Sequence, residues 1–242
     1  MLEHMEAAGA EVEFAADLAL FLRRAAGDGR LVSVECDGVS SLGHVVQSLG
    51  VPLTEVGSLT VNGATAQSSY RPAAGDRVRV DAVRRPQRLA EPRFVLDVHL
   101  GTLARRLRLL GIDSAYANDA DDDALVEQAN AERRVLLTQD RGLLRRRRLW
   151  AGGFVRGTKP DDQLADVLDR FAPPLAPWTR CVACNGPLSQ VSKADVDSSL
   201  LPGTKRTYRS FSRCADCGQV YWRGAHSRHL QAIIDSATQP AT

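Results

Sequence analysis

Residues 94–111 read FVLDVHLGTLARRLRLLG and join a strand pattern to a helix pattern. The apolar run from Phe94 to Leu96 ends at Asp97, which is typical of a short buried strand. The leucines that follow recur at helical spacing, and Gly111 stands where a glycine commonly ends a helix. This stretch therefore predicts a strand, a tight connection and a helix, which is the repeating unit of an α/β fold.

The same alternation continues as far as residue 172. Further strands are predicted at residues 114–117, 134–138 and 153–155, and helices at about 122–132, shortly after 140 and at 161–171. Val135, Leu136 and Leu137 form a continuous apolar run, as expected of a strand that is covered on both faces. We expect residues 94–172 to form a parallel sheet with helices on both faces.

Acidic residues follow the predicted strands, at the ends where α/β sheets bind ligands. Asp97 closes the first strand, and Asp140 comes two residues after Thr138. The further candidates are Asp119, Asp121 or Asp122 after the second strand, and Asp161 or Asp162 after the fourth. Clustered carboxylates repel one another unless cations are bound. Oxygen ligands suit magnesium or manganese, which activate water for phosphodiester hydrolysis.

A structural role competes at each of these positions, because aspartate is a favoured helix N-cap. Asp122, Asp161 and Asp162 stand where helices begin and could simply cap them. Asp97 and Asp140 together, at the ends of two central strands, favour a functional site. A phosphorylated receiver-type domain has a similar layout, whereas glycine-rich phosphate loops of the types GxxxxGK[ST] and GxGxxG are absent from the sequence.

Arginines surround the predicted acidic site. Three lie on the first predicted helix, one directly follows Asp140, and four more fill residues 145–148. Such charge attracts polyanions without sequence preference. The arginines expected to contact RNA are Arg105, Arg108, Arg141 and Arg145. The alternative is a solvated helix face, since lysines supply only three of the 31 basic residues, and the few aromatic residues reveal no stacking platform for bases.

Residues 94–113 closely resemble the opening of the Mut-seven C-terminal RNase family, a group of PIN-like nucleases. Residues 135–141, VLLTQDR, resemble the family's second signature, which usually has a basic residue where Gln139 stands. The resemblance implies metal-dependent cleavage of single-stranded RNA, with Asp97 and Asp140 as metal ligands. It further implies that Asp122 best matches the family's acid three residues before the helix leucine, here Leu125. Asp161 or Asp162 would be the fourth acid of the site. Thr138 would orient Asp140 or a metal-bound water, or would simply end its strand.

Residues 10–83 carry the pattern of a small mixed α/β unit. Strands are predicted at 12–14, 31–35, 59–61 and 78–80, with a helix from Ser41 to Leu49. Asn62-Gly63 is a strong turn signal. This order resembles the β-grasp (ubiquitin-like) sulfur carriers, a fold that also accompanies the RNase family. Those carriers end in a glycine pair, whereas this chain continues through Val83 to Pro86, so we expect an adaptor or packing role.

Four of the five cysteines form two CxxC pairs, Cys181 with Cys184 and Cys214 with Cys217. Four thiolates make a closed tetrahedral zinc site, which is structural because it has no open position. Residues 179–230 are therefore predicted to form a zinc ribbon, with two disulfides as the alternative. The ribbon's candidate RNA-facing groups are Lys205, Arg206, Tyr208, Arg209, Tyr221, Trp222 and Arg223.

The 242 residues are 44% hydrophobic and 25% charged, as in globular proteins, and the net charge of +2 does not itself indicate a nucleic-acid partner. Proline-bearing stretches at 84–92 and 173–177 predict linkers between three segments. The sequence has neither an apolar run of roughly 18 residues nor a secretion signal, so we expect a cytoplasmic protein without membrane contact.

We therefore predict a metal-dependent endoribonuclease that uses magnesium or manganese, contains structural zinc and needs no small-molecule cofactor. The first alternative is a non-catalytic RNA- or ribosome-binding protein with a decayed nuclease site. The second is a β-grasp adaptor in sulfur transfer, which the missing glycine pair disfavours. The sequence does not indicate an oligomeric state.

Overall fold

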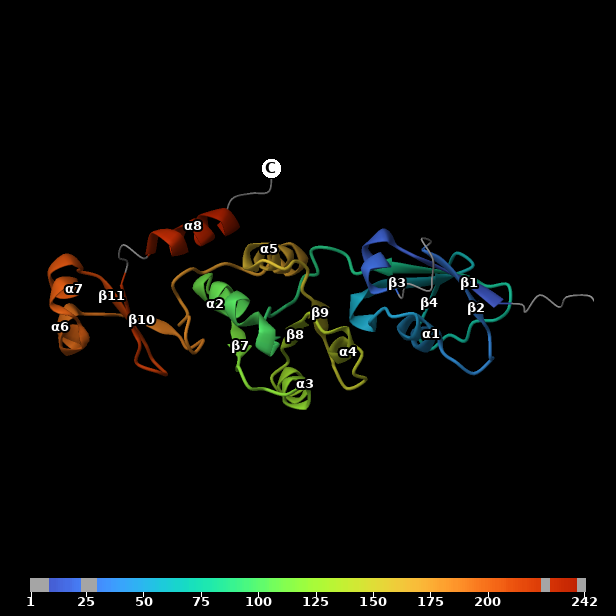
Figure 1. Cartoon of the computed structure of the whole chain (residues 1–242), viewed down its shortest axis with the longest axis horizontal. Helices are drawn as coiled ribbons and strands as arrows, with labels where there is room; N and C mark the ends of the chain where they lie inside the picture. The colour runs from blue at the N-terminus through green and yellow to red at the C-terminus, as the bar shows by residue number, and fades with distance from the viewer. Residues whose placement is uncertain (1–8, 23–29, 223–226, 239–242) are drawn as a thin grey trace, which may run out of the picture. The chain divides into compact units, whose positions relative to one another are not determined.

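The computed structural model describes residues 9–22, 30–222 and 227–238 (Figure 1). It contains two compact units. The first combines residues 1–85 with 138–154, and the second combines 86–137 with 155–242. Arg223, one of the predicted RNA-facing groups, lies outside the described residues, as do the other residues of 223–226 within the predicted ribbon.

The first unit contains a five-stranded sheet in the order β2-β1-β5-β3-β4. Its strands are β1 (Gly9–Phe14), β2 (Leu31–Glu35), β3 (Val56–Val61), β4 (Ala64–Ala66) and β5 (Arg77–Ala82). The central pair β1 and β5 is parallel, and its neighbours are antiparallel. α1 (Leu42–Ser48) and the 3-10 helices η1 (Ala16–Phe21) and η3 (Leu53–Glu55) accompany the sheet. This architecture confirms the predicted β-grasp fold.

Local signals explain the ends of these elements. Ser41 caps α1, and its hydroxyl accepts a hydrogen bond from the His44 N–H at 3.3 Å. Asn62 and Gly63 have φ angles of 52° and 83°, the left-handed values that the tight turn between β3 and β4 requires. The alternating apolar residues of β1 and β5 fill the core, where Val12 and Val80 are fully buried.

The middle of the chain supplies a four-stranded sheet in the order β7-β6-β8-β9. The strands are β6 (Phe94–Leu96), β7 (Ser114–Tyr116), β8 (Val135–Thr138) and β9 (Gly152–Phe154). β6 pairs in parallel with both β7 and β8, so that Leu96 lies opposite Tyr116 on one side and Leu137 on the other. All residues of β6 and β8 are buried, as the continuous apolar runs predict.

Helices follow the strands of this sheet. They are η4 (Val98–Leu100), α2 (Gly101–Leu109), α3 (Asp122–Ala131), α4 (Arg141–Leu144) and α5 (Pro160–Phe171). α2 packs against α5, while α3 packs against β6. Figure 1 shows α2 and α5 on one side of strands β6 to β8 and α3 on the other. Leu103 and Leu107 of α2 are fully buried, which confirms the leucine pattern.

Residues 138–154 belong to the same unit as the β-grasp sheet. The Phe154 N–H donates to Oε1 of Glu55 at 2.8 Å, and this glutamate is only 2% exposed. The rings of Phe21 and Phe154 meet edge to face with centroids 5.1 Å apart. The β-grasp core is therefore continuous with the segment that carries Asp140.

The last part of the chain forms a three-stranded antiparallel sheet in the order β10-β11-β12. Its strands are β10 (Leu188–Val191), β11 (Phe211–Cys214) and β12 (Val220–Trp222). The accompanying helices are α6 (Lys193–Val196), η5 (Asp197–Ser199), α7 (Pro202–Thr207) and α8 (Ser227–Thr238), the last of which contacts α2. In the described parts of the chain, every helix is too short or too polar to span a bilayer.

Candidate functional site

The strand order places β6 and β8 side by side at a reversal of the sheet. The chain passes from β6 to β7 on one side and then to β8 on the other. In α/β sheets, ligands bind beyond the carboxyl ends of the strands that flank such a reversal. Asp97 directly follows β6, and Asp140 follows the end of β8 by two residues.

The backbone at Asp97 is fixed by its neighbours. Its N–H donates to the Leu137 carbonyl at 3.0 Å, and its carbonyl accepts from the Leu100 N–H at 2.9 Å. Asp97 is buried, with 8% of its surface exposed. Gly101 allows the next turn to approach Tyr116, because a Cβ there would lie 2.6 Å from the tyrosine hydroxyl oxygen. The hydroxyl donates to the Val98 carbonyl at 2.8 Å, so the connection after β6 is closely packed.

Asp140 stands at the start of α4 and is exposed. Its Oδ1 accepts hydrogen bonds from the N–H groups of Gly142, at 2.6 Å, and Leu143, at 3.3 Å. The Asp140 N–H donates to Oγ1 of the fully buried Thr138 at 2.9 Å. Thr138 therefore fixes the backbone that presents Asp140.

Of the acidic residues after β7, one caps α3 and the others are exposed. Asp121 is the N-cap of α3, and its carboxylate accepts from the Ala124 N–H at 2.8 Å. Asp122 lies in the first turn of α3 and is exposed, as is Asp119 in the preceding loop. Of the three alternatives, Asp121 thus has a structural role as the N-cap of α3.

Asp161 lies in the first turn of α5 and pairs with an arginine. Its Oδ1 is 2.5 Å from Nη1 of Arg106, a side chain only 13% exposed, while Asp161 itself is 78% exposed. Asp162 is the next residue of the same turn and is exposed. Among the described residues, only the four cysteines place three or more ligand atoms within 4.8 Å of one another. The predicted acids therefore do not form such a cluster in this conformation.

Three of the arginines predicted to contact RNA differ in their surroundings. Arg105 is exposed on α2, and Arg145 is half-buried after α4. The guanidinium carbon of Arg141 lies 5.5 Å from the ring centroid of Phe21 and 6.0 Å from that of Phe154. Arg141 therefore packs on the β-grasp unit as well as following Asp140.

The structure does not support the predicted RNA contact at Arg108. Arg108 is 3% exposed, and its Nε donates to the Ser114 carbonyl at 2.8 Å. Its Nη1 donates to the carbonyls of Ala183 and Val182 at 2.8 and 3.2 Å. Burial lowers the pKa of this guanidinium. Arg108 lies on the helix face opposite to the one expected, where it holds the first CxxC loop against β7.

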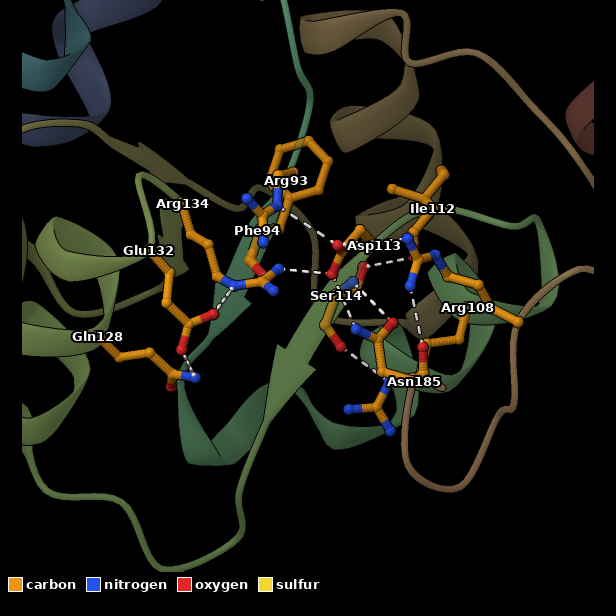
Figure 2. Close-up of polar contacts among 11 residues, drawn as sticks. Arg93, Phe94, Arg108, Ile112, Asp113, Ser114, Gln128, Glu132, Arg134 and Asn185 are labelled. Carbon is orange, nitrogen blue, oxygen red and sulfur yellow. Dashed lines mark hydrogen bonds and ion pairs between the residues drawn. The ribbon is translucent and has the colours of Figure 1, made fainter. Parts of the chain in front are cut away.

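Asp113 was not predicted as an important residue, yet it is the centre of an ionic network (Figure 2). Its carboxylate accepts from Nη1 of Arg134 at 2.5 Å and from Nδ2 of Asn185 at 2.8 Å. Arg93 and Arg180 approach it at 3.4 and 3.3 Å. Burial alone would raise the pKa of Asp113, but the hydrogen bonds from Arg134 and Asn185 outweigh it and lower the pKa.

The four cysteines form the candidate metal centre. Sγ of Cys181 lies 3.7 Å from that of Cys217, and Sγ of Cys184 lies 3.4 Å from that of Cys214. A tetrahedral site with metal–sulfur bonds of about 2.3 Å would place its sulfurs about 3.8 Å apart. The donor set therefore fits a four-thiolate metal site.

The thiols of this centre differ in their acidity. Burial raises the pKa of Cys184 to about 12. At Cys181 burial acts in the same direction, but the Tyr221 hydroxyl, 3.0 Å from Sγ, and nearby backbone N–H groups lower the pKa to about 7. The surroundings of Cys181 thus already favour the thiolate that a metal needs.

A family model of the Mut7-C RNAse domain matches residues 92–234. The chain belongs to the Mut7-C RNAse domain family. A second model, Mut7-C ubiquitin, matches residues 7–88, which contain the β-grasp sheet. The Mut7-C match continues past the sheet through the cysteine-bearing segment, which confirms the predicted order of parts and indicates a nuclease- or RNA-related function.

Two solved structures are similar to the N-terminal part. One, small archaeal modifier protein 1 of H. volcanii, is 24% identical over 31% of this chain and 95% of its own, with a TM-score of 0.24. The other, SAMP1 from Haloferax volcanii, is 22% identical over 30% of this chain and 91% of its own, with a TM-score of 0.23. None of the curated proteins matches the Mut7-C chain.

Proposed function

We propose that this chain is a PIN-like, metal-dependent endoribonuclease that hydrolyses phosphodiester bonds of single-stranded or structured RNA. The match to the Mut7-C RNAse domain carries the proposal. The position of Asp97 and Asp140, after the strands that flank the reversal of the sheet, supports it. An RNA substrate and a cytoplasmic location are parts of the same proposal.

Asp97 and Asp140 are the proposed principal ligands of magnesium or manganese, and Asp122 is the proposed third acid. Carboxylate oxygens suit these ions, and one or two carboxylates together with substrate phosphates often suffice for magnesium. The bound ion would activate water and neutralise charge on the phosphate. Asp161 stays a candidate for the fourth position, but it must exchange its ion pair with Arg106 for a metal. Asp162 in the same turn is its alternative.

Other residues of the chain bind and orient. Arg105 and Arg145 are proposed to attract the phosphates of RNA, while Arg141 would do so only by sharing its contact with Phe21 and Phe154. Thr138 would orient Asp140 through the backbone hydrogen bond. The four cysteines are proposed to hold zinc, which would be structural because four thiolates leave no position for substrate.

The second candidate function is RNA binding without catalysis. Two observations favour it: the capping bonds at Oδ1 of Asp140 and the ion pair of Asp161 give both carboxylates a structural role. Under this alternative the arginines still bind RNA, while the aspartates only stabilise the starts of helices.

Cleavage of labelled RNA by the full chain, with manganese or magnesium, separates the two candidates. The test compares the wild type with Asp97→Asn, Asp140→Asn and a matched control, Glu127→Gln, which changes an exposed carboxylate of α3. We expect both aspartate variants to lose at least about 100-fold in rate, because a carboxamide is a poor ligand for these ions. The control should cleave as the wild type does.

Folding is checked by thermal unfolding for each variant. Cleavage that persists in folded Asp97→Asn and Asp140→Asn proteins would contradict the proposed site. RNA binding without metal-dependent cleavage by the wild type would favour the non-catalytic alternative.

A further inference from the structure

The cysteine-bearing sheet has two different faces. Successive residues of a strand point to opposite faces, so Phe211 and Ser212 of β11 face in opposite directions. Phe211 packs with Val196 and Leu200 in a small hydrophobic core. On the other face, Ser212 lies opposite Gln190 of β10 and Tyr221 of β12, and these three residues border a cavity of about 490 Å³.

Aromatic side chains from separate segments line this cavity. Trp178 comes from the linker before the sheet, and Tyr221 and Trp222 come from β12. Trp222 borders the cavity from the other face of the sheet, because it lies opposite Phe211 and its ring centroid is 6.5 Å from that of Phe211 and 6.4 Å from that of Tyr208. The sequence named Tyr221 and Trp222 as candidate RNA-facing groups but revealed no stacking platform, because aromatic residues are few.

The backbone of Trp178 gives an independent indication that its position matters. Its φ angle is 65°, in the left-handed region that bulky residues rarely adopt. The end of α2 holds this conformation, since the Trp178 N–H donates to the Leu109 carbonyl at 3.2 Å and the Ala176 N–H to the Leu110 carbonyl at 2.9 Å. Backbone strain of this kind concentrates at functional sites.

Polar groups complete the lining. Gln190, Ser210 and Ser212 offer an amide and two hydroxyls, and their side chains make no hydrogen bond to any other part of the chain that the structure describes. Arg209 and Arg213, both exposed, flank the two serines along the chain. Among the described residues that line the cavity, none is acidic. The site thus combines planar apolar walls, hydrogen-bonding groups and nearby positive charge.

We propose that this cavity binds an unstacked base of single-stranded RNA. Stacking on aromatic side chains and hydrogen bonds to the base edge are the means by which proteins bind single-stranded RNA. Trp178 and Tyr221 supply the aromatic surfaces, and Gln190 and Ser212 bond to the base edge. The proposal rests on the proposed function, since the bound strand is the RNase domain's substrate, and it adds a binding site away from Asp97 and Asp140.

Tryptophan fluorescence tests the proposal without turnover. The background is the full chain with Trp150→Phe, which removes the tryptophan outside the cavity, and Asp97→Asn, which prevents cleavage. Short oligouridylate and oligoadenylate should quench the emission. Trp178→Ala should weaken binding roughly 5- to 100-fold, the effect of losing one base–aromatic stack. Trp178→Phe, which keeps an aromatic surface, should restore most of the affinity.

A second variant guards against loss of the fold. Gln190→Glu changes an exposed side chain and places a negative charge at the proposed base edge, so it should also weaken binding. Metal content of the cysteine site shows whether each variant is folded. Unchanged RNA binding in folded Trp178→Ala and Gln190→Glu proteins would overturn the proposal. If Trp178→Ala loses the metal of its cysteine site, the RNA binding of Gln190→Glu alone tests the proposal.

The outcomes for the cavity and for the nuclease are separable. Trp178-dependent binding by a wild-type chain that cleaves no RNA would support the cavity and count against the nuclease. Metal-dependent cleavage together with unchanged binding in the variants would overturn the cavity alone. Quenching by an apolar peptide, with none by RNA, would overturn it in favour of a protein partner.

Discussion

At the scale of single residues, arginine and aspartate take opposite roles according to burial. Arg105 is exposed, so its side chain is accessible to solvent or a polyanion. Arg108, three positions later, is buried and donates hydrogen bonds to backbone carbonyls. Asp97 and Asp113 likewise lie in one stretch of sequence. Asp97 follows the carboxyl end of β6, while Asp113 lies just before β7, at the amino end of that neighbouring strand, and binds arginines.

The first prediction at this scale concerns Thr138. Thr138→Val keeps the shape of the side chain but removes the oxygen that accepts from the Asp140 N–H. Since a displacement of about 1 Å can cost about 100-fold in rate, we expect kcat for RNA cleavage to fall about 10- to 100-fold. Thr138→Ser, which keeps the hydroxyl, should retain most of the activity. Equal loss in both variants would contradict the prediction, because Thr138→Ser keeps the hydroxyl that accepts the hydrogen bond.

The second prediction concerns Asp113 and pH. Asp113→Asn removes one of the two carboxylates that pair with the buried Arg134, and Glu132 remains as the other, so we expect a loss of about 2 kcal/mol in the free energy of unfolding at pH 7. Because the folded-state pKa of Asp113 is lowered, its contribution is present above the ordinary value of 3.8 and lost as pH falls through the folded-state pKa.

Urea unfolding of both proteins between pH 7 and pH 3 checks this dependence. The difference in free energy of unfolding between wild type and Asp113→Asn should be constant near neutral pH and should shrink below about pH 4. A difference that does not change with pH would show that hydrogen-bond geometry, and not the charge of Asp113, stabilises the network.

At the scale of elements, the ends of helices follow from local sequence, but the space around them does not. Gly111 ends α2 with a φ angle of 81°, as its position after the leucine pattern predicts. A Cβ at Gly111 would also collide with the carbonyl oxygen of Ala176, which the sequence does not show. The close approach joins the end of α2 to the linker that carries Trp178.

We therefore expect Gly111→Ala to destabilise the protein by more than about 1 kcal/mol, because it adds strain at a positive φ and a steric collision. Gly203→Ala in α7 is the matched control, since a Cβ there meets no atom within 4 Å of the described residues. The control should be neutral or slightly stabilising. Thermal unfolding of both variants measures the difference, and equal melting temperatures would contradict the prediction.

At the scale of the whole molecule, each of the two compact units combines two separate stretches of the chain. Residues 138–154 cluster with the β-grasp sheet, to which they are joined by Phe21, Phe154 and Glu55. The N-terminal segment thus packs on the part of the RNase domain that contains Asp140. This finding supports a packing role for the β-grasp fold, whereas the boundaries of three separate domains stay a prediction.

Metal removal is the prediction at this scale. Cys184→Ser breaks the four-sulfur set, so we expect loss of about one zinc per chain and a lower melting temperature. The first CxxC loop is tied to β7 through Arg108 and Asn185, so hydrogen exchange should also rise at residues 112–116. Cys36→Ser is the control, because Cys36 lies outside the four-cysteine cluster and its substitution should leave the zinc content unchanged.

The sequence by itself determined many of the elements, the two folds and the four-cysteine cluster. Periodic apolar residues, caps and turn residues act over a few positions, so β6, α2 and the Asn62-Gly63 turn were predictable. The CxxC spacing likewise predicted the cysteine cluster. Only the tertiary structure decided the adjacency of β6 and β8, the burial of Arg108, the network at Asp113 and the cavity at Trp178. Each of these depends on residues far apart in the chain, whose meeting is set by packing and strand order and leaves no local pattern.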